Sequence, residues 1–180
     1  MIGNYIGLDA GGTLDRGNAT YGIGITSGGA NTVGGTAAGE KNAISGNDQY
    51  GVGILGGGGS TVIGHYIGTD ANETAAVPNT IHGVFIGSSA SWNTIGGTTS
   101  AARNITCGNT QFGVHITNSG SDNNTVLGNY IGTDVNGTSD LGNGTYGIRI
   151  EDSASSVPPP MARVMRRLRP PSLPLRPPIL

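Results

Sequence analysis

Apolar residues recur along this chain at short, regular intervals, separated by glycine, asparagine, serine and threonine. Five segments share the order ring, glycine, apolar, variable, apolar, and they start 29, 32, 30 and 34 residues apart: Tyr21–Ile25, Tyr50–Ile54, His82–Ile86, Phe112–Ile116 and Tyr146–Ile150. A near-constant period of this length is typical of a solenoid, in which each repeat buries its apolar side only by stacking on its neighbours. The alternation at the end of each segment predicts a short β-strand with an inner and an outer face.

Residues 112–145 indicate how one repeat is built. They contain three predicted strands, Gly113–Ile116, Asn124–Val126 and Asn129–Ile131, which polar turns separate. Three short strands with turns between them predict one triangular coil. Successive coils would lie ~4.8 Å apart, the usual spacing of neighbouring strands, so parallel ladders would satisfy the backbone donors and acceptors.

Stacking of the coils predicts columns of like residues. The apolar inner columns are Ile23/Val52/Val84/Val114/Ile148, Ile25/Ile54/Ile86/Ile116/Ile150, Val33/Val62/Ile95/Val126 and Ile6/Ile44/Ile67/Ile131. Thr106 stands where the last column should have another isoleucine. Two polar columns are predicted at turns, where stacked amides can hydrogen-bond along the column. They are Asn31/Ser60/Asn93/Asn124 and Asn4/Asn42/His65/Asn104/Asn129.

The repeats also alternate in kind. Coils that begin at Tyr21 and His82 carry N-T-[VI]-G-G-T, whereas those at Tyr50 and Phe112 carry [SN]-T-V-[IL]-G-x-Y-I-G-T-D, so the full period is about 62 residues. This doubled motif resembles the right-handed parallel β-helix repeats of the pectate-lyase-like superfamily. Within that group it is most similar to tandem repeats of large bacterial extracellular and cell-surface proteins. The resemblance implies an all-β, right-handed parallel β-helix of about four full coils over residues 1–156.

The composition changes abruptly at Val157. Residues 157–180 contain eight of the nine prolines and five arginines but no glycine. Proline has no backbone donor and a fixed φ, so this stretch cannot continue a β-ladder. We expect a disordered Pro/Arg-rich tail, which is either a docking segment or an out-of-frame end.

Charge and hydropathy narrow the range of partners. Before residue 157, eleven acidic residues stand against four basic ones, a net charge of −7 that makes nucleic acid a poor partner. No apolar run is long enough for a membrane span, and no signal peptide is visible. Because the chain opens in the middle of a repeat, we expect it to be a segment of a longer secreted or cell-surface protein. Uncapped coils would expose ladder edges and allow end-to-end self-association.

Catalytic motifs of the resembled superfamily do not appear in the sequence. The superfamily includes polysaccharide-degrading enzymes, tailspikes, adhesins and non-catalytic stalks, and fold alone does not choose among them. The paired aspartates that hydrolases of this fold need are absent, and Lys41 and Arg103 occupy matching loops that suit a structural role. Two motifs of other enzyme classes, G-x-S-x-G and H-E-x-x-H, are absent as well. The sequence therefore favours a non-catalytic structural or adhesive role with polysaccharide as partner. The alternatives are a polysaccharide lyase or glycoside hydrolase, and an ice-binding β-helix with the row Thr32, Thr61, Thr94 and Thr125.

Four outward residues near the end of the repeats form the candidate site. Phe85, His115 and Arg149 share one outer column, and Glu151 lies in the column beside it. A ring can stack on a sugar, a histidine can act as a base, and the last two can form an ion pair. Ordinary solvated surface is the alternative interpretation, because such residues are common there.

Three aspartates open similar loops of the form D-x-[GN]-[GE]-T. They are Asp9, Asp70 and Asp134. Such loops can hold Ca²⁺ through carboxylate and carbonyl oxygens, but a full site needs more acidic ligands than these provide. The sequence favours an Asx-turn, with the carboxylate bound to an N–H two residues on, and predicts no other cofactor.

Overall fold

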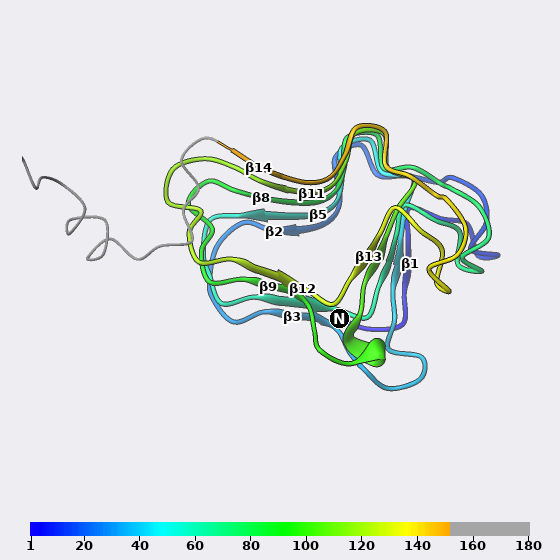
Figure 1. Cartoon of the computed structure of the whole chain (residues 1–180), viewed down its shortest axis with the longest axis horizontal. Helices are drawn as coiled ribbons and strands as arrows, with labels where there is room; N and C mark the ends of the chain where they lie inside the picture. The colour runs from blue at the N-terminus through cyan, green and yellow to red at the C-terminus, as the bar shows by residue number, and fades with distance from the viewer. Residues whose placement is uncertain (152–180) are drawn as a thin grey trace, which may run out of the picture.

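The computed structural model describes residues 1–151, which wind through three parallel β-sheets (Figure 1). Sheet 1 contains β1 (Tyr5–Ile6), β4 (Ala43–Ile44), β7 (Tyr66–Ile67), β10 (Ile105–Thr106) and β13 (Tyr130–Ile131). Sheet 2 contains β2 (Tyr21–Ile25), β5 (Tyr50–Leu55), β8 (His82–Gly87), β11 (Phe112–Ile116) and β14 (Tyr146–Ile150). Sheet 3 contains β3 (Thr32–Gly34), β6 (Thr61–Ile63), β9 (Thr94–Gly96) and β12 (Thr125–Leu127). The predicted tail at 157–180 lies outside the described residues.

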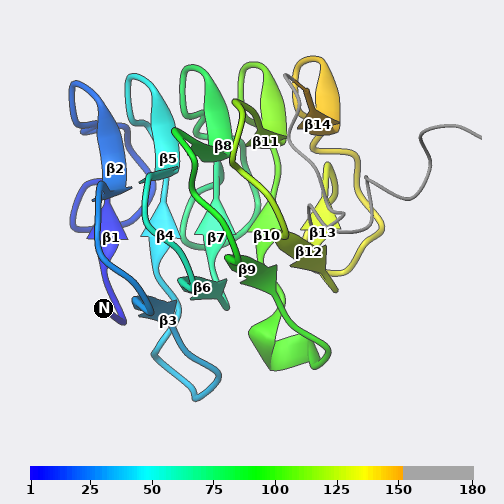
Figure 2. The same cartoon turned by 90° about the vertical axis from the view of Figure 1, so that its left-hand side faces the viewer.

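Each complete coil contributes one strand to every sheet. Neighbours within a sheet come from successive coils, as Figure 2 shows for sheet 2 from β2 to β14. All strand pairs are parallel, and the chain makes about four turns, which confirms the predicted all-β parallel solenoid. A short 3-10 helix, η1 (Ser100–Ala102), lies in the loop between β9 and β10. Over residues 1–151, no helix has the length and hydrophobicity that a bilayer crossing requires.

The interior is filled by the predicted apolar columns. Val52 pairs with Val84 in sheet 2, and Ile44 pairs with Ile67 in sheet 1. These four side chains are fully buried and belong to one continuous core cluster. The columns are therefore confirmed, and each coil depends on its neighbours for burial of its apolar face. In the repeat used for prediction, β11, β12 and β13 differ from the expected strands by one residue at their ends.

Asparagine side chains connect the coils at three corners. The two predicted columns are hydrogen-bonded ladders: Asn93 donates from N and Nδ2 to Asn124 Oδ1, both at 2.9 Å, and Asn104 does the same to Asn129 at 3.0 and 3.1 Å. A third ladder lies at the corner between sheets 1 and 2, and we call it the inner ladder. It contains Asn18, Asn47, Asn79, Asn109 and Asn143. These side chains bind each coil to the next where the chain changes direction.

Every strand of sheet 2 bends at its second residue, which is always glycine. A Cβ placed on Gly51 would lie 2.7 Å from the carbonyl oxygen of Gly83 and 2.8 Å from Ile67 Cγ2, so only glycine fits. This position faces the interior, and so does Val52 after it. Strict alternation would put Tyr50 on the same side as Val52, but the bend turns its ring to the outer face, where it stacks on neighbouring rings.

The predicted weak point of the core is a buried threonine. Thr106 is fully buried, and its Oγ1 has no hydrogen-bond partner in the described structure. We expect Thr106→Val to stabilise the protein by about 1 kcal/mol, because valine keeps the shape and removes a hydroxyl that loses water on folding. The midpoint of thermal unfolding should rise by roughly 2–4 °C. Thr125→Val, at an exposed strand position, is the control and should change little. An unchanged or lower midpoint for Thr106→Val would show that its hydroxyl is satisfied.

Candidate functional site

The outer face of sheet 2 carries a continuous column of rings, which we call the ring column. It contains Tyr21, Tyr50, His82, Phe112 and Tyr146. The first four are stacked, with centroids 5.2, 5.3 and 4.4 Å apart in chain order, and Tyr146 is tilted at 5.4 Å from Phe112. Each ring is the first residue of its strand. The glycine bend that follows turns its side chain to the outer face. The column crosses all five strands of sheet 2 at their first residues and lies next to the predicted site.

The predicted outer column stands directly beside these rings. His115 pairs with Phe85 on one side and with Arg149 on the other, so the three come from adjacent strands β8, β11 and β14. Phe85 stacks on Tyr50 with centroids 4.5 Å apart. This stacking is possible because Gly53, the register partner of Phe85, has no side chain to occupy the space. The two columns therefore form one packed aromatic surface rather than isolated solvated side chains.

A hydrogen-bonded chain runs through the centre of this surface. His115 Nδ1 lies 3.0 Å from His82 Nε2, and His115 Nε2 lies 2.7 Å from Glu151 Oε1. The other carboxylate oxygen of Glu151 forms an ion pair with Arg149. The structure thus places the ring of Phe85 against that of His115 and joins His115 to Arg149 through the Glu151 carboxylate. It adds His82, which the sequence analysis did not include in the site.

Burial and hydrogen bonding determine the protonation states of this chain. Burial lowers the pKa of His82 to about 4, and the neighbouring His115 acts in the same direction. Burial raises the pKa of Glu151, but hydrogen bonds from His115 and Arg149 outweigh it and hold the pKa below its ordinary value. Because a carboxylate only accepts, His115 Nε2 carries the proton of this contact and donates a hydrogen bond to Glu151 Oε1. When His115 is neutral, its Nδ1 accepts from His82 Nε2.

This arrangement leaves no accessible ring nitrogen for proton abstraction. His115 is 7% exposed, and both of its ring nitrogens are engaged. The remaining nitrogen, His82 Nδ1, is buried without a partner in the described structure. A general base must come within hydrogen-bond reach of its substrate. The geometry therefore suits a hydrogen-bonded chain that joins neighbouring strands, while Phe85, Arg149 and Glu151 keep partly exposed surface.

The three loop aspartates use their carboxylates to close their own loops. Asp9 Oδ1 accepts from the backbone N–H groups of Thr13 and Leu14, and Asp134 Oδ1 from those of Thr138 and Ser139, at 2.7–3.1 Å. Asp70 makes the equivalent bonds. The bonds reach four and five residues on, farther than the expected Asx-turn, although the Asp9 carboxylate also interacts with the N–H of Gly11, two residues on. They lower the pKa of Asp9, and that of Asp134 to about 2. Within residues 1–151, no group of three or more His, Cys, Asp or Glu side chains is placed to hold a metal ion.

The threonine row of sheet 3 is in register. Thr32, Thr61, Thr94 and Thr125 pair in succession along β3, β6, β9 and β12. Two positions along each strand, Gly34 pairs with Ile63 and Gly96 pairs with Leu127. The row beside the threonines therefore alternates between glycine and a large apolar side chain, so the surface there is uneven.

Three parallel sheets, ladder-bonded corners and a two-coil period define the class of protein: a parallel β-helix repeat protein. The chain matches no known protein family, no curated protein and no solved structure.

Proposed function

We propose that this chain is a non-catalytic structural or adhesive segment of a secreted or cell-surface protein, and that it contacts polysaccharide. The observation that carries the proposal is the closed hydrogen-bond chain on sheet 2. His115 is the best-placed candidate base, and its two nitrogens are bonded to His82 and Glu151. A face of stacked rings whose candidate base is already hydrogen-bonded favours binding of a polysaccharide over catalysis on it.

The resemblance to pectate-lyase-like repeats of bacterial surface proteins is part of this proposal. It is supported by the two-coil period and by the ladders at the corners. We further propose end-to-end association of copies. In the described range, the last strand, β14, exposes Tyr146, Ile148 and Ile150 at 54, 45 and 62%. Parallel strands at an open end present unpaired backbone groups that a second copy can extend.

A second candidate function is a carbohydrate-active enzyme. The observation that favours it is the order carboxylate, imidazole, imidazole in Glu151, His115 and His82, since carboxylates orient and polarise histidine bases in many enzymes. Rotation of Glu151 away from His115 would expose the Nε2–H, which could then donate its proton to a leaving group as a general acid. Arg149 would then stand beside a negative sugar group.

The test is to measure binding and turnover on the same polysaccharides. We expect the chain to be retained on at least one polysaccharide column and to release neither unsaturated products that absorb in the ultraviolet nor new reducing ends. Sedimentation velocity on the same sample should show species that grow with protein concentration. Product release that His115→Gln abolishes would replace the scaffold proposal with the enzyme. Thermal hysteresis without retention would replace it with ice binding.

A further inference from the structure

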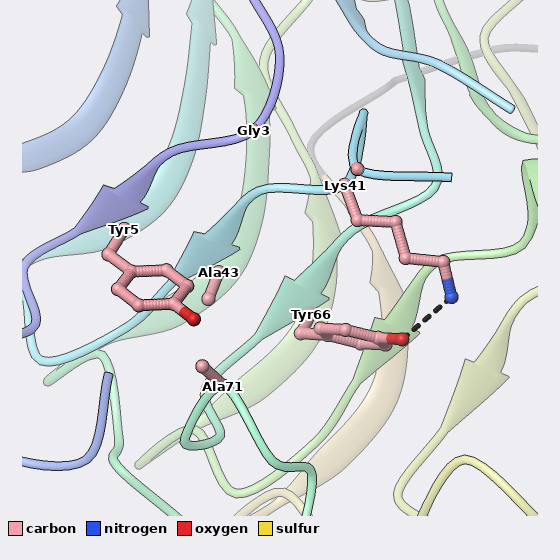
Figure 3. Close-up of a pocket in the computed structure, with 7 residues that line it drawn as sticks. Gly3, Tyr5, Lys41, Ala43, Tyr66 and Ala71 are labelled. Carbon is pink, nitrogen blue, oxygen red and sulfur yellow. Dashed lines mark hydrogen bonds between the residues drawn. The ribbon is translucent and has the colours of Figure 1, made fainter. Parts of the chain in front are cut away.

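A small pocket opens on the outer face of sheet 1 (Figure 3). Sheet 1 lies on a different side of the coil from sheet 2, which carries the ring column (Figure 1). Its volume is about 300 Å³. It is lined by Gly3, Tyr5, Gly39, Lys41, Ala43, Tyr66 and Ala71. Figure 3 shows the rings of Tyr5 and Tyr66 on either side of Ala43 and Ala71, with the Lys41 ammonium beside the Tyr66 hydroxyl. We call this pocket the tyrosine slot.

The slot exists because one residue in an outer column is small. Strand register places Tyr5, Ala43, Tyr66, Ile105 and Tyr130 in succession along sheet 1. Tyrosines thus alternate with aliphatic residues. Ala43 separates the first two tyrosines, and its short side chain, which is 2% exposed, forms the floor of the space between them. The larger Ile105 stands at the equivalent position between the second and third tyrosines.

The lining combines apolar faces with hydrogen-bonding groups. Lys41 Nζ donates to Tyr66 Oη at 2.7 Å and lies 4.5 Å from the centre of that ring. Tyr5 is 53% exposed and makes no side-chain hydrogen bond within residues 1–151, so its hydroxyl and ring edge are open. Burial raises the pKa of Tyr66, and so does the nearby carboxylate of Glu73. The Lys41 ammonium therefore lies at the Tyr66 hydroxyl, and the Glu73 carboxylate, which lines another pocket, brings a negative charge near the same ring.

These features together define the ligand. Two tyrosine rings and two alanine methyl groups suit a molecule with an apolar face, while the ammonium and hydroxyl groups suit several neutral hydroxyls. A volume at the lower end of the range for small-molecule sites admits one ring rather than a chain. We propose that the tyrosine slot binds one neutral hexopyranose residue of a polysaccharide. The proposal rests on the polysaccharide contact proposed above and gives that contact a location.

The test fills the slot by replacing Ala43 with isoleucine, the residue at the equivalent position 105 of the same column. Ala43→Ile copies Ile105, so the variant is expected to fold. In affinity electrophoresis through gels that contain dextran, galactomannan or xyloglucan, at least one neutral polysaccharide should retard the wild-type protein. Ala43→Ile and Tyr5→Ala should each weaken that binding about tenfold or more, since loss of a ring or of ring access costs on the order of 1.4 kcal/mol. Tyr130→Ala removes a ring that borders only the filled position, and it should bind as the wild type does.

The outcomes separate the slot from the broader proposal. Equal retardation of Ala43→Ile and wild type would refute the slot and leave polysaccharide contact standing. Retardation by polygalacturonate alone would refute the neutral ligand class. If no polysaccharide retards the wild type, the proposed contact fails. The slot is then decided by NMR titration with the methyl glycosides of glucose, galactose and mannose. Shifts of the Ala43 and Ala71 methyl signals that Tyr5→Ala abolishes would uphold it, and their absence would overturn it.

Discussion

Replacement of Asn79 by alanine should lower the free energy of unfolding by about 3–5 kcal/mol, because several buried groups lose their partners at once. Asn79 is fully buried in the middle of the inner ladder. Its Oδ1 accepts from the backbone N of Asn47 at 3.1 Å and from Asn47 Nδ2 at 2.9 Å. Its Nδ2 donates to Ile44 O at 3.1 Å and to Asn109 Oδ1 at 2.9 Å. Urea unfolding followed by circular dichroism measures the loss.

The same ladder provides a matched control at its exposed first position. Asn18 donates from N and Nδ2 to Asn47 Oδ1, and its side chain is exposed. Water can replace it, so Asn18→Ala should cost less than about 1 kcal/mol. If both variants lose equal stability, the inner ladder does not carry the free energy that its burial implies.

The coil architecture was predictable because its evidence is repeated. Each apolar column rests on four or five independent positions, and the pairing of Val62 with Ile95 or Ile54 with Ile86 follows from the period alone. Asparagine columns at Asn93 and Asn104 were predictable for the same reason. A single repeat would not have distinguished a coil from any other set of short strands. The prediction therefore came from the spacing of the segments and not from local propensity.

The inner ladder was missed although its signal is regular. In all five repeats, an asparagine lies three residues before the ring that starts the sheet 2 strand, as Asn79 does before His82. Glycine precedes four of these asparagines and proline the fifth, but the pair of residues that follows differs in every repeat, so local sequence similarity alone does not reveal the column. Only the distance to the strand is constant. Alignment of the repeats on the strand start would have found it.

The candidate site was predicted in part. Period-two alternation correctly placed Phe85, His115 and Arg149 on the outer face, and the register puts them side by side. Their role in function stays a prediction. His82 was missed because the same alternation, extended back across Gly83, assigns it to the interior. The glycine bend reverses that assignment, and a bend caused by close backbone approach is not visible in a hydrophobic pattern.

Mild acid should destabilise the protein strongly through two buried histidines. Burial lowers the pKa of His65 to about 4, and the positive amino terminus adds to this effect. Burial also lowers the pKa of His82 to about 4, where His115 and Arg149 oppose its protonation and Glu151 favours it. Both side chains are 4% exposed or less. Unfolding would release each histidine to titrate near its ordinary pKa of about 6.5.

The sign of the effect follows from proton uptake. Between pH 6.5 and pH 4 the unfolded chain binds more protons than the folded one, so the free energy of unfolding falls as the pH falls. This contribution to the free energy of unfolding is fully present above about pH 6.5 and is lost by about pH 4. The loss is on the order of 3 kcal/mol for each histidine. The loop carboxylate of Asp134, with a pKa of about 2, acts only at lower pH. Unfolding midpoints measured at pH 7.5, 6, 5 and 4 should trace this loss.

Two variants assign the loss to particular residues. His65 occupies an asparagine ladder between Asn42 and Asn104, and its Nε2 has no partner in the described structure, so His65→Asn should restore the ladder and remove about half of the pH dependence. His82→Phe continues the ring column between Tyr50 and Phe112 and should remove most of the other half. It also breaks the bond to His115, so its stability at pH 7.5 should fall while its profile flattens. A full acid-induced loss in the double variant would show that neither buried ring controls it. That result would mean that each ring has the same pKa in the folded and the unfolded chain, and so that burial does not keep it neutral.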